Sequence, residues 1–216
     1  DLENAGYSPK LFSYDWRRSI TSISNDLYSR VQALRAQSPG RPIGIVAHSM
    51  GGLVIRAATH HAQRHGQRWL QHLHQAAYLG SPHLGSPYER LGHRANRLLG
   101  LTPYTRPLMK IGNLRSNGIM DLRHGRVTTP DQPAPTALHP TTRHLLLAAH
   151  MGREYRPHWL GDGLVPVTSA LGQHADAARM LTGDDVTRVQ IATLGHLAML
   201  GDARVYQALQ EWMQPS

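Results

Sequence analysis

The sequence predicts an α/β protein with a mostly parallel sheet that is flanked by helices. Short apolar segments alternate along the chain with longer segments in which apolar residues recur every three or four positions, as strands and amphipathic helices do. A serine also stands between one of these strands and the helix that follows it, within residues 44–56. A chain of 216 residues is long enough for one domain with a sizeable core.

The segment around this serine predicts a strand, a sharp turn and a helix. Ile43, Ile45 and Val46 are apolar and β-branched, as a buried parallel strand requires. Residues 47–51 read Ala-His-Ser-Met-Gly, and apolar residues then recur at helical spacing. This matches the pattern Gly-x-Ser-x-Gly, with alanine for the first glycine, in which the serine hydroxyl is exposed above the sheet. The alternative is that Ser49 only caps the helix.

The other elements follow in chain order. The pattern predicts a short strand at 11–14, helices at 20–38, about 52–65 and 203–213, and strands at 75–80, 143–149 and 186–192. Residues 85–140 break the alternation, because scattered apolar residues stand among Gly, Pro and Arg. We predict a lid-like, mostly helical insertion there. The whole chain is then one domain, with a core of residues 1–84 and 141–216.

Composition excludes several classes of protein. The formal charge is +9, but the arginines that dominate it are scattered and match no nucleic-acid-binding motif, so nucleic acid is not an expected partner. No apolar run is long enough to span a membrane. The absence of cysteine excludes disulfides and a thiol nucleophile. Neither a cytoplasmic nor a secreted location is excluded, and the oligomeric state is left open.

Fifteen histidines raise the possibility of a metal site. His61 and His65 lie four residues apart on a predicted helix, and His72 and His74 follow them. No acidic residue accompanies them at the spacing of metal ligands, so a solvated helix face is the favoured interpretation. We expect no metal and no cofactor.

Three residues in distant loops form a candidate catalytic set. Ser49, Asp162 and His196 each follow a predicted strand, and the carboxyl ends of parallel strands meet at one edge of the sheet. A serine hydroxyl needs a base to take its proton, which His196 would do, while Asp162 would hold the imidazole. The backbone N–H of Met50, at the start of the helix, would stabilise the oxyanion.

Other residues compete for these roles. His48 neighbours the nucleophile, but a side chain one position away points in another direction. His150 and His158 do not follow the last strand. Asp184 and Asp185 precede that strand and so belong to the opposite edge of the sheet.

Five motifs in a fixed order carry a resemblance to known families. They are Tyr-Asp-Trp-Arg at 14–17, Ala-His-Ser-Met-Gly-Gly at 47–52, Gly-Ser-Pro-His-Leu-Gly-Ser at 80–86, Gly-Asp-Gly-Leu-Val-Pro at 161–166 and Gly-His at 195–196. In this combination the chain resembles serine esterases and lipases of the α/β-hydrolase fold. It is most similar to the lecithin:cholesterol acyltransferase-like branch and related bacterial lipases. The resemblance implies a Ser49–Asp162–His196 triad that cleaves carboxylic esters, with lipid-like substrates.

The resemblance also implies which residues meet the substrate and which partners to expect. His48, His83, Leu84 and Leu164 are candidates for substrate contact, although for His83 a role in bracing its loop is equally supported. A small-molecule or lipid ester is the expected partner, and peripheral contact with a membrane or lipid surface is compatible with it.

One departure concerns the start of the chain. Relatives normally have about three earlier strands and a His-Gly or similar loop that supplies a second oxyanion donor. Nothing before Gly6 matches that loop, so we expect a fragment of a longer protein or an incomplete oxyanion hole. Two other functions stay open: a non-catalytic remnant that needs another segment, and an acyltransferase with the same triad.

Overall fold

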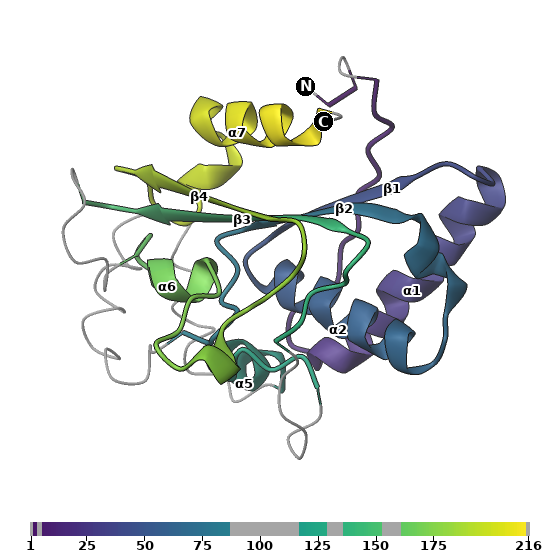
Figure 1. The fold of residues 1–216 in the computed structure, drawn as a ribbon, viewed down its shortest axis with the longest axis horizontal. Helices are drawn as coiled ribbons and strands as arrows, with labels where there is room; N and C mark the ends of the chain where they lie inside the picture. Colours follow the sequence, from purple (N-terminus) through teal and green to yellow (C-terminus); the bar gives the residue numbers. More distant parts are fainter. Residues whose placement is uncertain (1, 4–5, 87–116, 129–135, 153–160, 215–216) are drawn as a thin grey trace.

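A computed structural model describes residues 2–3, 6–86, 117–128, 136–152 and 161–214 of the chain. Within them, four strands form one sheet in the order β1-β2-β3-β4, and every neighbouring pair is parallel. The strands are β1 (Ile43–His48), β2 (Leu73–Leu79), β3 (Arg143–His150) and β4 (Val186–Ala192). Helices α1 (Ile20–Gln37) and α2 (Met50–Arg64) cover one face, and α7 (Ala203–Met213) covers the other (Figure 1). The predicted α/β-hydrolase type of sheet is confirmed.

The central strand shows why the sheet needs helices on both faces. Leu145, Leu146 and Leu147 of β3 are each 0% exposed, and their side chains alternate between the faces. Leu146 packs in the cluster that contains α1 and α2, whereas Leu145 packs with Leu209 and Trp212 of α7. A strand buried on both faces is a continuous apolar run, which is the pattern that predicted it.

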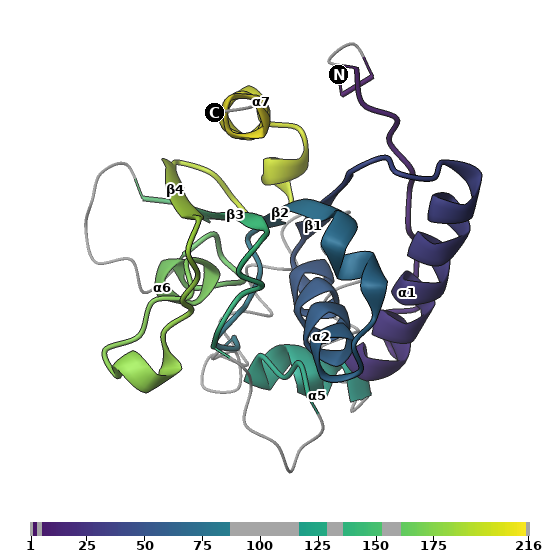
Figure 2. The ribbon, with the colours of Figure 1, turned by 45° about the vertical axis from the view of Figure 1, so that its right-hand side comes forward.

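The helices begin and end where the sequence predicts, within two residues. The Ser19 side chain accepts a hydrogen bond from the backbone N–H of Ser22, which caps the start of α1. Asp202 caps α7 in the same way. The apolar residues of α1 that recur every three or four positions are the ones that are buried: Ile20, Ile23, Leu27 and Val31. Figure 2 shows α7 end-on above the sheet, with α1 and α2 below it.

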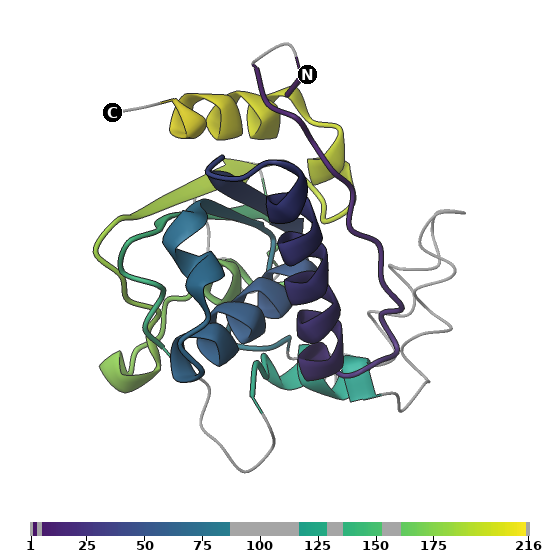
Figure 3. The same cartoon turned by 90° about the vertical axis from the view of Figure 1, so that its right-hand side faces the viewer.

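The prediction of a strand at residues 11–14 is wrong. These residues lie in an irregular segment without strand pairing, which runs past α1 to its first turn (Figure 3). A strand needs a neighbour for its backbone hydrogen bonds, and among the described residues β1 pairs with β2 only. Tyr14 instead packs against the helical core.

Only part of the predicted insertion lies within the described residues. Helix α5 (Asn117–His124) caps the start of α1, because the Asp121 carboxylate accepts a hydrogen bond of 3.0 Å from the Ile20 N–H. The backbone N–H of Ser86 also donates to the Arg123 carbonyl of α5. Residues 87–116 lie outside the described part, so the lid remains a prediction, as does the single domain with a core of 1–84 and 141–216.

Among the described residues, nothing pairs with the outer edge of β1, which borders a groove of about 740 Å³. The groove lies between β1, α1 and the segment of residues 7–14, and it reaches the turn after β1 at His48 and Gly51. Val46 on this edge is 39% exposed. An apolar strand edge with free N–H and C=O groups is a template for pairing with another chain.

We therefore expect the 216-residue chain to self-associate through this edge when it is purified alone. Val46→Lys should lower the associated fraction, because a lysine on an edge strand disfavours edge-to-edge pairing. Sedimentation velocity at increasing concentration measures this fraction. Gln210→Lys is the matched control, because it adds a lysine at an exposed position of α7 that is remote from β1 in sequence. Equal association of the two variants would contradict the role of the edge.

Candidate active site

Ser49 lies on a strained turn between β1 and α2. Its backbone has φ 54° and ψ −124°, a conformation that residues other than glycine rarely adopt. The turn is close-packed as well as sharp. A Cβ added at Gly51 would lie 3.2 Å from the Ala47 Cβ, and one at Gly52 would overlap the Ser81 side chain. The small residues of the motif are therefore required where strand and helix pass each other.

The alternative in which Ser49 only caps the helix is wrong. Its side chain makes no capping hydrogen bond to α2. The Ser49 N–H donates to the Leu79 carbonyl at the end of β2, at 2.9 Å. The turn is thus fixed through the backbone, while the hydroxyl is not used by the helix.

Asp162 and His196 form a buried hydrogen-bonded pair. The Asp162 Oδ2 lies 2.7 Å from the His196 Nδ1, and the two side chains are 0% and 5% exposed. The other carboxylate oxygen, Oδ1, accepts backbone N–H bonds of 2.9 Å from Leu164 and 2.8 Å from Val165. The His196 N–H donates to the Asp162 carbonyl at 2.9 Å. Hydrogen bonds therefore fix both carboxylate oxygens of Asp162. The bond from the His196 N–H also joins the loop of Asp162 to the loop of His196.

The end of β2 approaches this pair closely. Gly80 has φ 58°, and a Cβ there would lie 3.1 Å from the Asp162 Oδ2 and 3.3 Å from the His196 Nδ1. It would also lie 2.5 Å from the Met199 side chain. Glycine is required here both for the left-handed backbone and for the space beside the pair.

We expect Gly80→Ala to destabilise the fold. The left-handed backbone alone costs about 1–2 kcal/mol for an alanine, and the contacts with Met199 and the pair add to it. Gly66→Ala is the matched control, since Gly66 has φ 60° and nothing within 4 Å of an added Cβ. Urea denaturation should show a larger loss of unfolding free energy for Gly80→Ala than for Gly66→Ala. Equal losses would contradict the close approach.

His48 connects the Ser49 turn to the pair. Its ring centroid lies 4.5 Å from that of His196, and its Nε2 lies 3.0 Å from the His196 backbone oxygen. Because His48 precedes Ser49 directly, the histidine loop is held at the serine turn. The described contacts include no hydrogen bond between the Ser49 hydroxyl and His196, and such bonds often form only when substrate is bound.

The remaining candidates for substrate contact lie in or beside the loop of residues 80–86. The His83 ring is 2% exposed and packs edge-on against Tyr78, and burial lowers its pKa well below the usual range. Its carbonyl accepts a hydrogen bond of 3.2 Å from the buried Arg56 of α2. This position fits the bracing role, and substrate contact by His83 remains a prediction.

The same loop is fixed to the acid turn on its other side. Ser169, in the short helix α6 (Val167–Ala170), accepts a hydrogen bond from the Leu84 N–H and donates one to the Gly85 carbonyl. The Ser86 hydroxyl donates to the Leu164 carbonyl at 2.7 Å. Leu84 and Leu164 thus lie in the two loops joined here, and their contact with substrate stays a prediction. Arg56 and Ser169 hold this loop by hydrogen bonds, and the sequence interpretation did not single them out.

The described residues that competed with Asp162 and His196 for the roles of acid and base make other contacts. Asp185 pairs with Arg143 at 3.5 Å, at the amino ends of β3 and β4, which is the opposite edge of the sheet. The His150 carbonyl accepts the Leu194 N–H at the end of β3. His158 lies outside the described residues. The buried pair with His196 is made by Asp162.

Within the described ranges of the chain, no group of three or more His, Asp or Glu side chains is arranged to hold a metal ion. His61 and His65 stack on each other along α2, with ring centroids 4.0 Å apart.

None of the described helices is long and apolar enough to cross a membrane.

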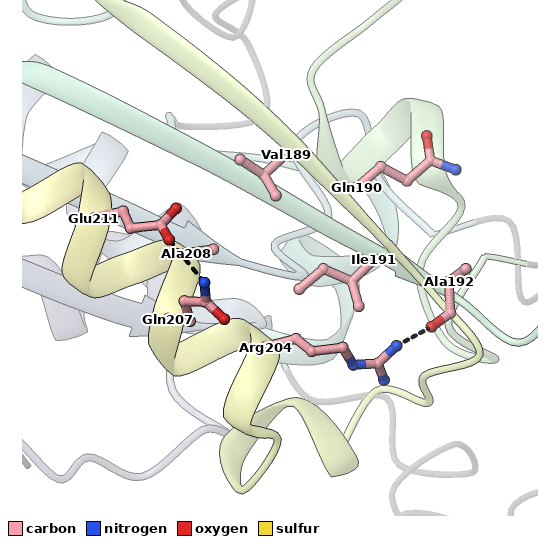
Figure 4. Close-up of a pocket in the computed structure, with 8 residues that line it drawn as sticks. All are labelled: Val189, Gln190, Ile191, Ala192, Arg204, Gln207, Ala208 and Glu211. Atoms are coloured by element: carbon pink, nitrogen blue, oxygen red, sulfur yellow. Dashed lines mark hydrogen bonds between the residues drawn. The ribbon is translucent and has the colours of Figure 1, made fainter.

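A second pocket lies away from these residues, between β4 and α7 (Figure 4). It has a volume of about 320 Å³, and Arg204 crosses its end to donate to the Ala192 carbonyl at 2.9 Å. Ser49, Asp162 and His196 do not line it. The candidate active site is therefore the convergence of loops at the carboxyl ends of the strands, and not this pocket.

A parallel sheet with helices on both faces, a strained serine after β1 and a buried Asp–His pair at the same edge are features of the α/β-hydrolase fold. The first 91 residues match the family model of lecithin:cholesterol acyltransferase. No curated protein matches the chain. The resemblance inferred from the five motifs is confirmed at the level of the α/β-hydrolase fold.

Solved structures with this fold include a lipase and an esterase. The mature form of the Bacillus licheniformis lipase BlEst2 is 17% identical with a TM-score of 0.52, and the match covers 89% of this chain and 75% of that one. Its propeptide form is 19% identical with a TM-score of 0.51, over 92% and 42% of the chains. The metagenomic carboxyl esterase MGS0156 is 18% identical with a TM-score of 0.55, and the match covers 92% of this chain and 57% of that one. The chain thus spans about half the length of the latter two, and identities this low show a shared fold.

Proposed function

We propose that this protein hydrolyses carboxylic esters through an acyl-Ser49 intermediate. The observation that carries the proposal is the buried 2.7 Å hydrogen bond between Asp162 and His196, at the sheet edge where the strained Ser49 turn lies. The Asp162 carboxylate accepts a hydrogen bond from His196 Nδ1–H, so the Nε2 of a neutral His196 has a free lone pair. That lone pair is the base that the serine requires.

The reaction follows in two steps. In the first, Ser49 Oγ bonds to the ester carbonyl carbon as His196 Nε2 takes the hydroxyl proton, and the same proton then goes to the departing alcohol oxygen. In the second, water attacks the acyl-enzyme with His196 again as base, which releases the carboxylic acid and restores Ser49. Asp162 remains ionised throughout and stabilises the imidazolium.

The oxyanion is stabilised in this proposal by the Met50 N–H. Met50 is the first residue of α2, so its N–H has no acceptor within the helix. Its position directly after the nucleophile is the one that supplies an oxyanion donor in nucleophile turns of this type. Loss of one such donor typically costs about 10²–10³ in rate, so a second donor from another segment would raise the rate by a comparable factor.

Lipid-like esters are the substrate class that we propose. Three exposed apolar side chains lie in or beside the loops that carry the pair: Met151 at 44%, Leu197 at 36% and Leu200 at 65% exposure. The names of similar structures, a lipase and a carboxyl esterase, support this class. Exposed apolar side chains beside the site also support our proposal of peripheral contact with a lipid surface.

A burst experiment tests the acyl-enzyme. Mixing the protein with a short-chain nitrophenyl ester should release nitrophenol in a rapid phase with an amplitude equal to the enzyme concentration, followed by a slower steady state. Release no faster than that of a Ser49→Ala variant at the same concentration would contradict the proposal.

A second candidate is acyl transfer, because the matching family model is that of an acyltransferase. The same acyl-enzyme would then be attacked by an alcohol instead of water. Product analysis with and without an alcohol acceptor distinguishes the two. A rise in the acylated alcohol at the expense of the free acid would assign transfer, and unchanged acid release would assign hydrolysis.

A further inference from the structure

His48 makes two separate contacts with His196. Its ring packs on the His196 ring, with centroids 4.5 Å apart and planes inclined by 42°. Its Nε2 lies 3.0 Å from the backbone oxygen of His196, so Nε2–H donates a hydrogen bond to that carbonyl. These contacts join the last residue of β1 to the loop after β4, across 148 positions of sequence.

We propose that His48 is a positioning residue that fixes the plane of the His196 imidazole for proton transfer with Ser49. The inference rests on the proposed function. Asp162 holds His196 at two atoms, Nδ1 and the backbone N–H. These two bonds leave the ring able to tilt about the Nδ1 contact, which would move Nε2. His48 supplies what is missing, because it holds the backbone oxygen of His196 and lies against the ring.

The charge state of His48 suits this role. Burial lowers the pKa of His48 to about 4, and the charge of His196 lowers it further, while the hydrogen bond to the His196 backbone and the charge of Asp162 act against this shift. His48 is therefore neutral near pH 7. A neutral ring does not oppose the positive charge that His196 acquires during the reaction, whereas a cation at this distance would.

The geometry also distinguishes positioning from two other roles of His48. Its Nε2–H donates to the His196 carbonyl, so a neutral His48 has its lone pair on Nδ1, and the described contacts include no hydrogen bond between that atom and Ser49. A residue that only contacted substrate would have no need of a hydrogen bond to the catalytic loop. The contacts of His48 converge on the residue whose orientation limits proton transfer, and a misplacement of about 1 Å at such a site can cost about 10²-fold in rate.

Two variants separate the two contacts. His48→Phe keeps a ring against His196 and removes the donor, whereas His48→Gln keeps a donor at similar reach and removes the ring. We expect each to lower kcat by about 10- to 100-fold with KM changed less than about twofold. We also expect the acidic limb of the pH profile of kcat/KM to shift, because that limb reports the protonation of the base in the free enzyme.

A double-mutant cycle tests whether His48 acts through His196. Combined with Asp162→Asn, the loss from a His48 variant should be smaller than its loss alone, because both residues orient the same imidazole. His65→Gln is the matched control, since it removes one ring from the stacked pair with His61 on α2. It should leave kcat and the pH profile unchanged.

Other outcomes overturn the inference. A rise in KM with kcat unchanged would assign His48 to substrate binding. A lower melting temperature with no change in the acidic limb of the pH profile of kcat/KM would assign it to folding alone. Full loss of activity in Ser49→Ala with unaltered kinetics in both His48 variants would refute the positioning role and leave the proposed function intact. Activity that survives Ser49→Ala would refute the proposed function instead.

Discussion

Replacing Ser49 with alanine is expected to abolish ester hydrolysis while the fold is retained. The proposed reaction has no other nucleophile, and removal of the serine from a triad lowers kcat by about 10⁶-fold. The fold should persist because the Ser49 hydroxyl caps no helix, and the turn is held by its backbone bond to Leu79. Turnover of a short-chain nitrophenyl ester and circular dichroism of the same samples measure both expectations.

A second serine provides the control for this experiment. Ser29 lies on the outer face of α1, where its hydroxyl bonds only to the preceding turn of the helix. Ser29→Ala should hydrolyse esters at the unaltered rate. Turnover by Ser49→Ala at the rate of the Ser29→Ala protein would remove Ser49 from the mechanism.

Asp162→Asn should produce the second largest effect, a loss of about 10⁴-fold in kcat. The asparagine can keep its oxygen toward the Leu164 and Val165 N–H groups, so the acid turn should remain folded. Its amide nitrogen would then face the His196 Nδ1. Because that group donates a hydrogen bond instead of accepting one, the imidazole proton would move to Nε2, and the base would lose its free lone pair.

The control for the acid is Asp185→Asn. Asp185 is a half-exposed partner of Arg143 at the opposite edge of the sheet, so its replacement should leave kcat unaltered. The pre-steady-state burst should disappear in Asp162→Asn and persist in Asp185→Asn. A large loss in Asp185→Asn alone would show that the acid has been assigned to the wrong residue.

Most of the fold could be predicted because its strands and helices are locally encoded. The β-branched and leucine-rich runs gave β3 and β4 to within a residue, and the spacing of Ile20, Ile23 and Leu27 gave α1. The segment of residues 11–14 could not be predicted from its own residues, because a strand exists only where a partner strand supplies hydrogen bonds. That information is not local.

The loop positions of the three candidate catalytic residues could also be predicted from the sequence. The order and loop positions of Ser49, Asp162 and His196 follow from topology, since parallel strands end at one edge. The close contact between Asp162 and His196 and the turn conformation of Ser49 agree with that reasoning, while their catalytic roles remain a proposal.

The residues that support the site were harder to predict. His48 packs on His196 only because two loops far apart in sequence converge, and no local pattern signals this contact. The burial of His83 likewise depends on Arg56 and Tyr78 around it. One signal was available: Arg56 stands two helical turns after Ser49, on the buried face of α2, where a charged residue must find a partner.

Labelling with a fluorophosphonate tests the central claim most directly. This reagent forms a stable bond with a serine hydroxyl that a neighbouring base has activated. Peptide mass mapping should find one adduct per protein molecule, located on Ser49, and labelling should slow strongly in Asp162→Asn. An adduct on another residue, or continued ester hydrolysis by protein whose Ser49 remains unlabelled, would contradict the claim that Ser49 is the nucleophile of this protein.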